Sequence, residues 1–183
     1  MKKTLLTCSL MLFSAMPYAI DTSVLKAAVM KDVEAHIHTP EIIAAIKAQN
    51  AEHATLDEAA ILELDQQWRA ERKADEKPLI SKVLSNSVSA KLSTLKEDST
   101  GAYNEIFVMD NKGLNVGQSD VTSDYWQGDE AKFQQSYGTN SVHVGDVDLD
   151  ESSQAVGVQI SSVVKDPDTG EKIGAVTFGV NFQ

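Results

Sequence analysis

The sequence predicts an α+β fold in which long N-terminal helices pack on a five-stranded antiparallel sheet. Two observations carry this prediction. Up to about residue 100, apolar residues recur at helical spacing behind helix-start signals. After Gly101 the spacing changes to that of strands, and short turns separate the apolar runs. Helices followed by antiparallel strands are typical of an α+β domain in which helices cover one face of the sheet.

The first residues have the composition of a secretory signal peptide. Two lysines precede an apolar run from Leu5 to Met16, which is shorter than the ~20 residues that span a bilayer. We therefore expect residues 1–19 to be a cleaved signal peptide and residues 20–183 to form one periplasmic domain. An uncut signal that acts as a weak anchor is the alternative. Cys8, the one cysteine, lies in the signal, so the mature chain can form no disulfide.

The chain is acidic. Its formal charge is −11, and loss of residues 1–19 removes two lysines and no acid, which leaves −13. Nucleic acids and anionic membrane surfaces attract basic faces, so neither is an expected partner. The same charge would keep a periplasmic protein soluble.

The N-terminal half, residues 20–100, is predicted to be helical. Thr39-Pro40-Glu41 is a start signal, with Thr39 as the cap and Pro40 at the first helical position. Thr55-Leu56-Asp57-Glu58 has the pattern of a capping box for a second helix. A further helix follows Pro78. Its apolar face is Ile80, Leu84, Val88, Leu92 and Leu95.

Residues 101–183 are predicted to hold the sheet. The expected strands are Ile106 to Met109, Leu114 to Ser119, Val142 to Leu149, Ala155 to Val164 and Ile173 to Val180. Turns at Asn111-Lys112-Gly113 and at Asp166 to Gly170 predict that the first two strands and the last two form antiparallel hairpins. A short helix from about Asp129 to Ser136 is expected between the second and third strands.

The most informative stretch is EIFVMDNKGLNVGQSDVTSDYWQGD, which begins at Glu105. It ends in a polar segment that holds Tyr125 and Trp126 side by side. Two large rings with polar tips, on a connection beside a sheet, are typical of a pocket for a small polar molecule. Because neighbours on an extended segment point opposite ways, we expect one ring to face the pocket. The alternative is that the rings anchor the loop to the sheet.

Three segments, FVMDNKGLNVGQS, TSDYWQGDEAKFQ and IGAVTFGV, carry a resemblance to a known family. The chain resembles a free-standing member of the Cache (PDC, PAS-like) extracytoplasmic sensor domains of bacterial chemoreceptors and sensor kinases. The resemblance covers roughly Leu56 to Val180. It implies a single Cache domain whose ligand lies between the PAS-like sheet and the segment linking strands two and three, here Asp120 to Ser141. It also implies a membrane receptor or sensor kinase as partner, and a homodimer through the N-terminal helices.

Further polar residues are candidates for ligand contact. Asp129 either caps the short helix or touches the ligand, and Lys132 either meets a ligand carboxylate or pairs on the surface. Gln159, Ser161 and Thr177 are polar positions in otherwise apolar strands. They are either exposed to solvent or placed on the sheet floor below the ligand.

No catalytic or metal motif stands out. No serine lies in a Gly-x-Ser-x-Gly turn, and no pair of acids is marked as acid and base. Asp146 to Asp150 begins like a calcium loop, but Glu151 stands where the loop needs glycine. His36 and His38 have no third ligand close in sequence. We therefore expect no enzyme activity, no cofactor and no bound metal.

Together these observations predict a periplasmic sensor module that binds an unidentified small polar molecule and signals through a partner protein. The alternative is a protein–protein interaction or dimerisation module with no small ligand. In that case the chain's own side chains would fill the pocket.

Overall fold

The computed structural model describes residues 22–150 and 155–182, so the predicted signal peptide lies outside the described residues. The helices are α1 (Ser23–Asp32), η1 (Val33–Ile37, a π-helix), α2 (Pro40–Glu52), α3 (Glu58–Glu71), α4 (Pro78–Leu84), α5 (Ser87–Asp98), α6 (Ala131–Phe133) and η2 (Gln134–Gly138, a π-helix). The strands are β1 (Tyr103–Met109), β2 (Asn115–Gln118), β3 (Val142–Asp150), β4 (Ala155–Lys165) and β5 (Lys172–Asn181). Within the described ranges, no helix has the length and hydropathy to cross a membrane.

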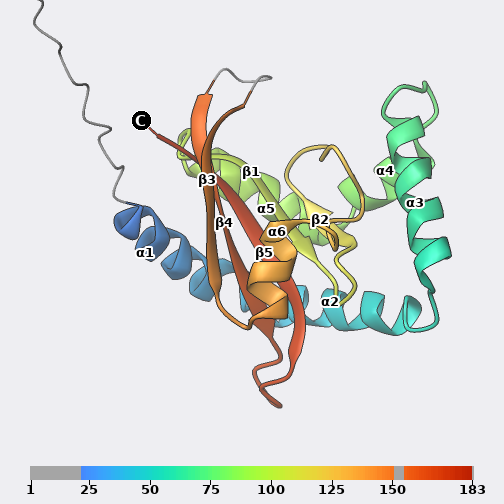
Figure 1. Cartoon of the computed structure of the whole chain (residues 1–183), viewed down its shortest axis with the longest axis horizontal. Helices are drawn as coiled ribbons and strands as arrows, with labels where there is room; N and C mark the ends of the chain where they lie inside the picture. The colour runs from blue at the N-terminus through green and yellow to red at the C-terminus, as the bar shows by residue number, and fades with distance from the viewer. Residues whose placement is uncertain (1–21, 151–154, 183) are drawn as a thin grey trace, which may run out of the picture.

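The strands form one open antiparallel sheet in the order β2-β1-β5-β4-β3 (Figure 1). Both predicted hairpins are present, β1 with β2 and β4 with β5. Gly113 and Gly170, in their turns, have φ of +85° and +73°, a left-handed conformation that glycine adopts without steric cost. The predicted fold class, α+β with a five-stranded antiparallel sheet, is confirmed.

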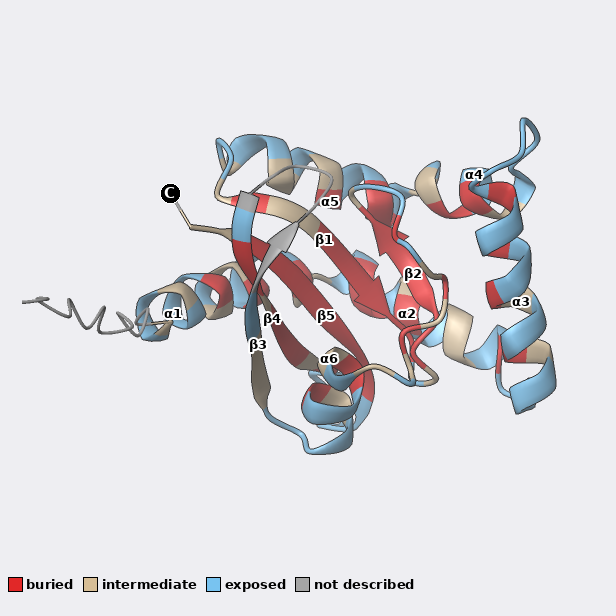
Figure 2. Ribbon diagram, turned by 45° about the horizontal axis from the view of Figure 1, so that its top comes forward, coloured by how far each residue is buried: buried red, intermediate tan, exposed pale blue. Residues whose placement is uncertain are grey.

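The larger core lies between one face of the sheet and helices α1, η1, α2 and α5 (Figure 2). Alternate strand residues point to this face because successive side chains of a strand lie on opposite sides. The fully buried members of this core include Ile37, Ile42, Ile46, Ile106, Val108, Ile160, Val164, Val176 and Phe178. Val88 and Leu92 of α5 are also buried here, so the apolar face of this helix covers the sheet. A homodimer through the N-terminal helices stays a prediction.

The opposite face of the sheet is covered at its centre by α6 and η2. Phe107, Met109 and Ala175 pack there against Phe133. The ring of Tyr137 stacks on Phe133, with the ring centroids 4.9 Å apart. The centre of the sheet is therefore buried from both sides, and polar strand residues on this face are removed from water as well.

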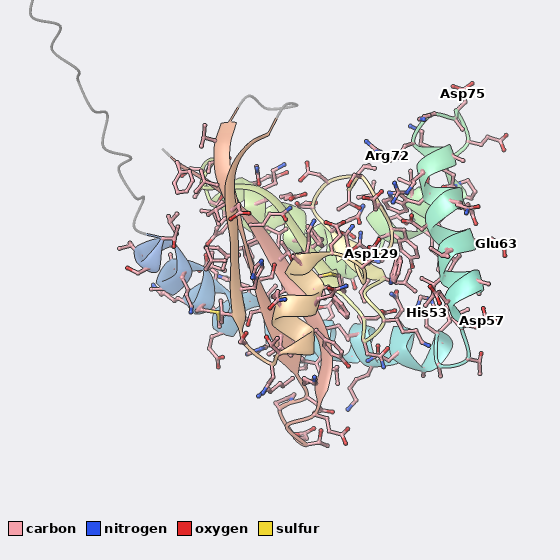
Figure 3. The ribbon with its side chains drawn as sticks, in the orientation of Figure 1. His53, Asp57, Glu63, Arg72, Asp75 and Asp129 are labelled. Atoms are coloured by element: carbon pink, nitrogen blue, oxygen red, sulfur yellow. The ribbon has the colours of Figure 1, made fainter. Side chains whose placement is uncertain are left out.

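A third apolar cluster lies beside β2, between α3, α4 and residues 119–130, which we call the crossover. Trp68, Ile80 and Leu114 are among its buried members. Helix α3 stands apart from the sheet, with Asp57, Glu63 and Asp75 along it and its following turn (Figure 3). The cluster is the apolar contact that joins this helical arm to the crossover.

Two predicted helix boundaries are wrong. The apolar face expected from Ile80 to Leu95 belongs to two helices, because Asn86 interrupts it. The Asn86 side chain accepts a hydrogen bond from Ser89 N (2.8 Å) to cap α5 and donates one to Val116 O (2.8 Å). Helix α3 is capped by Asp57, which accepts from Ala60 N at 2.9 Å, and not by Thr55.

The turn between β4 and β5 is tied to α2 by an ion pair. Lys47 Nζ lies 2.5 Å from the Asp166 carboxylate. This hydrogen bond, followed by a backbone hydrogen bond from Asp168, holds the pKa of Asp166 below its usual range. The ionised carboxylate is therefore the form that the folded state favours.

We predict that Asp166→Asn lowers the melting temperature at pH 7 and that this difference narrows as the pH falls below about 4. The folded-state pKa lies below the ordinary value of 3.8, so the carboxylate stabilises the fold above that pH and loses this contribution as it is protonated. Melting curves of both proteins between pH 3 and pH 7 measure the effect, and Asp168→Asn, at an exposed neighbour, is the control. A difference that is constant across this range would contradict the assignment.

Candidate functional site

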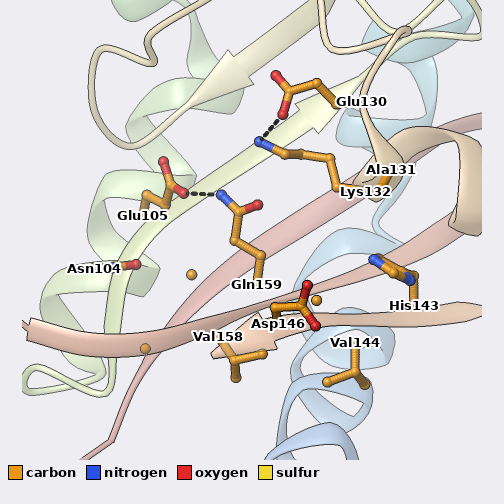
Figure 4. Close-up of a pocket in the computed structure, with 13 residues that line it drawn as sticks. Asn104, Glu105, Glu130, Ala131, Lys132, His143, Val144, Asp146, Val158 and Gln159 are labelled. Atoms are coloured by element: carbon orange, nitrogen blue, oxygen red, sulfur yellow. Dashed lines mark hydrogen bonds and ion pairs between the residues drawn. The ribbon is translucent and has the colours of Figure 1, made fainter. Parts of the chain in front are cut away.

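A cavity of about 470 Å³ opens on the α6 side of the sheet (Figure 4). Its floor comes from four strands and its roof from the start of α6. The lining residues are Asn104 and Glu105 of β1, Gly179 of β5, Gly157 to Gln159 of β4, His143 to Asp146 of β3, and Glu130 to Lys132. Its volume is within the range of pockets that hold small molecules.

A glycine occupies the middle of one row of the cavity floor. Glu105, Gly179 and Gln159 are cross-strand neighbours on β1, β5 and β4. Gln159 Nε2 donates a hydrogen bond to Glu105 Oε1 at 2.8 Å, so these two side chains meet above Gly179. A side chain at position 179 would clash with Asn104 and Glu105. Glycine at this position therefore leaves room for the side chains of Asn104 and Glu105, which close over it.

The outer wall of the cavity is shaped by an irregularity in β3. The pairing of β3 with β4 shifts register between Val144 and Val147. Gly145 and Asp146 lie in this interval and line the cavity. A bulge of this kind bends the strand and redirects side chains at the edge of a sheet.

Lys132 holds its ammonium group at the roof. Its Nζ lies 3.0 Å from Glu130 Oε2 and donates a hydrogen bond to Gln127 Oε1 at 3.2 Å. The same atom lies 5.4 Å from the centroid of the Phe107 ring, within the range of a cation–π contact. The side chain of Lys132 is only 13% exposed, so its charge is compensated by these three groups and not by water alone.

The cavity lining is rich in carboxylates. Glu105, Glu130 and Asp146 each contribute one, and Lys132 contributes the single ammonium group. The formal charge of the lining is −2 with His143 counted as neutral. The lining also holds a polar atom without a partner, because Asn104 Oδ1 is buried and accepts no hydrogen bond.

The structure brings two of the predicted site residues to the cavity, Lys132 and Gln159. Ser161 and Thr177 lie in a neighbouring row on the same side of the sheet, both fully buried, and their hydroxyl groups hydrogen-bond each other at 2.9 Å. The expected solvent exposure of these two residues is wrong because α6 and η2 cover them. Their part in ligand binding stays a prediction.

Tyr125 and Trp126 lie in the cluster beside β2 and do not line this cavity. Tyr125 is 4% exposed and stacks on Trp68, with ring centroids 5.4 Å apart and an interplanar angle of 20°. Burial raises the pKa of the Tyr125 hydroxyl. Trp126 Nε1 donates to Lys112 O at 2.8 Å. Both rings anchor the crossover in this state, and contact of either with a ligand stays a prediction.

A buried carboxylate fixes the crossover to α3. Asp65 is 5% exposed, and its Oδ1 accepts hydrogen bonds from Tyr125 N at 2.9 Å and Trp126 N at 3.1 Å. Arg69 pairs with Asp65 at 2.7 Å and with Asp124 at 2.8 Å. Sequence reasoning missed this role, because an acid on an amphipathic helix is normally predicted to lie on the solvated face.

Asp129 is exposed, and the predicted cap is wrong. Glu130 occupies the N-cap position of α6 and makes no capping hydrogen bond through its side chain. Sequence reasoning also missed Asn104, Glu105, His143 and Asp146 as cavity residues. Only strand register places them together, and no local signal in the sequence reveals that register.

Metal ligands do not cluster in the described part of the chain, where no group of three or more histidines, cysteines or acids could hold an ion. The sequence that resembles the start of a calcium loop extends past Asp150 into residues outside the described ranges. His38 pairs with Glu34 at 2.9 Å, while His36 is exposed.

No protein-family model matches the sequence, and no curated protein sequence matches it. Solved structures resemble the fold. One is the ligand-binding domain of the Campylobacter jejuni chemoreceptor Tlp3 in complex with 4-methylisoleucine, with 11% identity, a TM-score of 0.42, and coverage of 87% of this chain and 62% of that one. The neighbours are Cache-type sensor domains.

Two further neighbours belong to the same group. The sensor domain of the V. cholerae histidine kinase DctB has 12% identity and a TM-score of 0.40, with coverage of 87% of this chain and 57% of that one. The ligand-binding domain of the Pseudomonas aeruginosa PAO1 amino acid chemoreceptor PctC, in complex with GABA, has 10% identity and a TM-score of 0.39, with coverage of 87% and 58%. The chain thus spans about three fifths of the length of these domains.

We predict that Asp65→Ala lowers the free energy of unfolding by roughly 2–4 kcal/mol, because the buried backbone N–H of Tyr125 and the half-buried backbone N–H of Trp126 lose their acceptor. Urea unfolding measures the loss, and limited proteolysis should show faster cleavage within residues 119–130. Glu63→Ala, at an exposed position of the same helix, is the matched control. It should change the free energy of unfolding by less than about 0.5 kcal/mol. Equal losses for the two variants would contradict the assigned role of Asp65.

Proposed function

We propose that this chain is a periplasmic module that binds a small polar molecule in the cavity and reports it to a partner protein. The observation that carries the proposal is the cavity itself, about 470 Å³ with polar and charged groups on floor and roof. Pockets that bind small molecules have this size and place a few polar groups to fix orientation.

The chemistry of the lining favours binding over catalysis. Among the residues that the structure describes, the cavity lining has no serine, threonine, cysteine or tyrosine, so it offers no common hydroxyl or thiol nucleophile. What the lining offers is hydrogen-bonding and charged groups held in place by neighbours, such as Gln159 on Glu105 and Lys132 on Glu130. Such groups can fix the orientation of a bound polar molecule.

A route for the signal follows from how the roof is attached. Glu130 and Lys132 come directly after the crossover, and Asp65 holds the crossover to α3. A ligand that bonds to Glu130 or Lys132 would shift the position of the crossover. Because Asp65 ties the crossover to α3, the arm formed by α3 and α4 would shift with it. For a signal, the ligand must bind one arrangement of this arm more tightly than another. A membrane receptor or sensor kinase that contacts the arm would read the difference.

We predict that a compound from a library of small polar metabolites raises the melting temperature of the protein, because a ligand that binds only the folded state stabilises it by mass action. The gain is about 2.7 kcal/mol at a hundredfold excess over the dissociation constant. Ala131→Trp should abolish the shift for that compound. Ala131 is exposed and lines the cavity, so the indole would occupy the opening at little cost in stability.

The matched control is Gln135→Trp, which places the same ring on an exposed position of η2 outside the lining. It should leave the ligand-induced shift unchanged. A library in which no compound shifts the melting temperature would contradict small-molecule binding. A shift that survives in Ala131→Trp would place the ligand elsewhere on the molecule.

A further inference from the structure

We infer that β3 is an interaction surface for a second copy of this chain, and that two β3 strands pair antiparallel across a two-fold axis. The inference goes beyond the proposed function, and its test needs no ligand. Three observations support it: β3 is an open edge of the described sheet, its sequence is complementary to itself, and apolar residues beside it are exposed.

The two edges of the sheet differ. At β2 the crossover pairs with the strand, where Asn115 N donates a hydrogen bond to Tyr125 O at 3.1 Å. At the other edge, the backbone hydrogen bonds that β3 makes within the described ranges run to β4 alone. The outer side of this strand of nine residues therefore presents a row of unpaired N–H and C=O groups, which is a template for a further strand.

The bulge in β3 makes the strand complementary to itself. Val144 and Val147 are both paired with buried core residues of β4, so both point to the helix side of the sheet. Gly145 and Asp146 lie between them and together take one position of the strand. Two β3 strands that pair about this position match face to face. In the sequence, this register sets Val144 opposite Val147, His143 opposite Asp148 and Val142 opposite Leu149 of the second copy.

The chemistry of this register is favourable. Apolar residues directly opposite each other stabilise an antiparallel pair of strands, and so do residues of opposite charge such as a protonated histidine and an acid. The unfavourable contact is the approach of the two Asp146 carboxylates at the axis, and salt screens this repulsion. The pairing also joins the two cavities, because Gly145 and Asp146 line the outer wall of each.

Apolar residues on the helix side of β3 are exposed in the described structure. Val147 is 45% exposed, and Val156 of the neighbouring β4 is 43% exposed. Helix α1 projects past β3 on this side, and Val24 in its first turn is 70% exposed (Figure 2). A two-fold axis perpendicular to the sheet keeps both helix layers on the same side, so the projecting end of α1 comes to lie beside the strands of the second copy. The pairing therefore offers cover to all three valines.

Sedimentation equilibrium measures the pairing. The unaltered protein should form a dimer of twice the mass of one chain, and Val147→Lys should raise the dissociation constant of this dimer at least about tenfold, because a lysine then stands opposite a valine. Val147 is exposed, so the variant should fold, and near-ultraviolet circular dichroism checks that it does.

The matched control is Val121→Lys. Val121 is also 45% exposed but lies on the crossover, at the other edge of the sheet, so this variant should leave the dimer unchanged. A protein that stays monomeric up to about 1 mM would overturn the inference. A dimer that Val147→Lys leaves intact would overturn it as well, because that dimer uses another surface, such as the N-terminal helices.

Cysteine cross-linking tests the register. In a Cys8→Ser background the chain holds no other cysteine. A mixture of the Val144→Cys and Val147→Cys proteins should form disulfide-linked dimers faster than either protein alone, because residues directly opposite each other have Cβ atoms about 5 Å apart, closer than residues displaced along the strands. Equal rates in the mixture and in the separate proteins would overturn the inferred pairing.

Discussion

Strand register is the constraint on which the rest of this molecule depends. In the pairing of β1, β5 and β4, the row that contains Gly179 faces α6, while its neighbours Phe178 and Val180 face the large core. A shift of one residue would exchange the two faces and put Phe178 where the cavity now is. The apolar side chains that bury the sheet against α1, α2 and α5 therefore also fix the position of the hollow and of the polar groups beside it.

Both faces of the sheet carry a helix layer, but for different purposes. The N-terminal helices bury a continuous apolar surface and supply most of the stability expected from the hydrophobic effect. The second cover, α6 with η2, is short and closes only part of its face, with Phe133 packed beside the cavity and Lys132 at its roof. Because this cover follows the crossover in sequence, its position depends on the contact between Asp65 and the backbone of Tyr125 and Trp126.

Local features of the chain could be predicted from the sequence. The change from helical to extended spacing gave the α+β class, and the glycines of two turns gave the hairpins, because each signal depends on residues close together. The break at Asn86 was missed, since its side chain bonds to β2, thirty residues away. In the sequence, an apolar stripe that runs through two helices and the cap between them has the same spacing as the stripe of one longer helix.

The candidate site could be predicted only in outline. Its place between the sheet and the segment after β2 was expected, and Lys132 and Gln159 line the cavity. Glu105 was not expected, because its partner Gln159 lies 54 residues away and across Gly179. Tyr125 and Trp126 were expected at the pocket, yet they pack with α3 and α4. The contact of α3 with the crossover depends on the buried Asp65, and no periodic pattern in the sequence distinguishes this residue from an exposed acid.

If the ligand binds in the cavity lined by Gly179, the residues of its floor and roof must change their surroundings on binding. The most direct measurement is the change in backbone amide chemical shifts on titration of the isotope-labelled protein with a compound that raises its melting temperature. We expect the largest changes at Glu105, Gln159 and Gly179 on the floor and at Lys132 in the roof. Changes confined to the groove between α2 and α5, on the other side of the sheet, would contradict it.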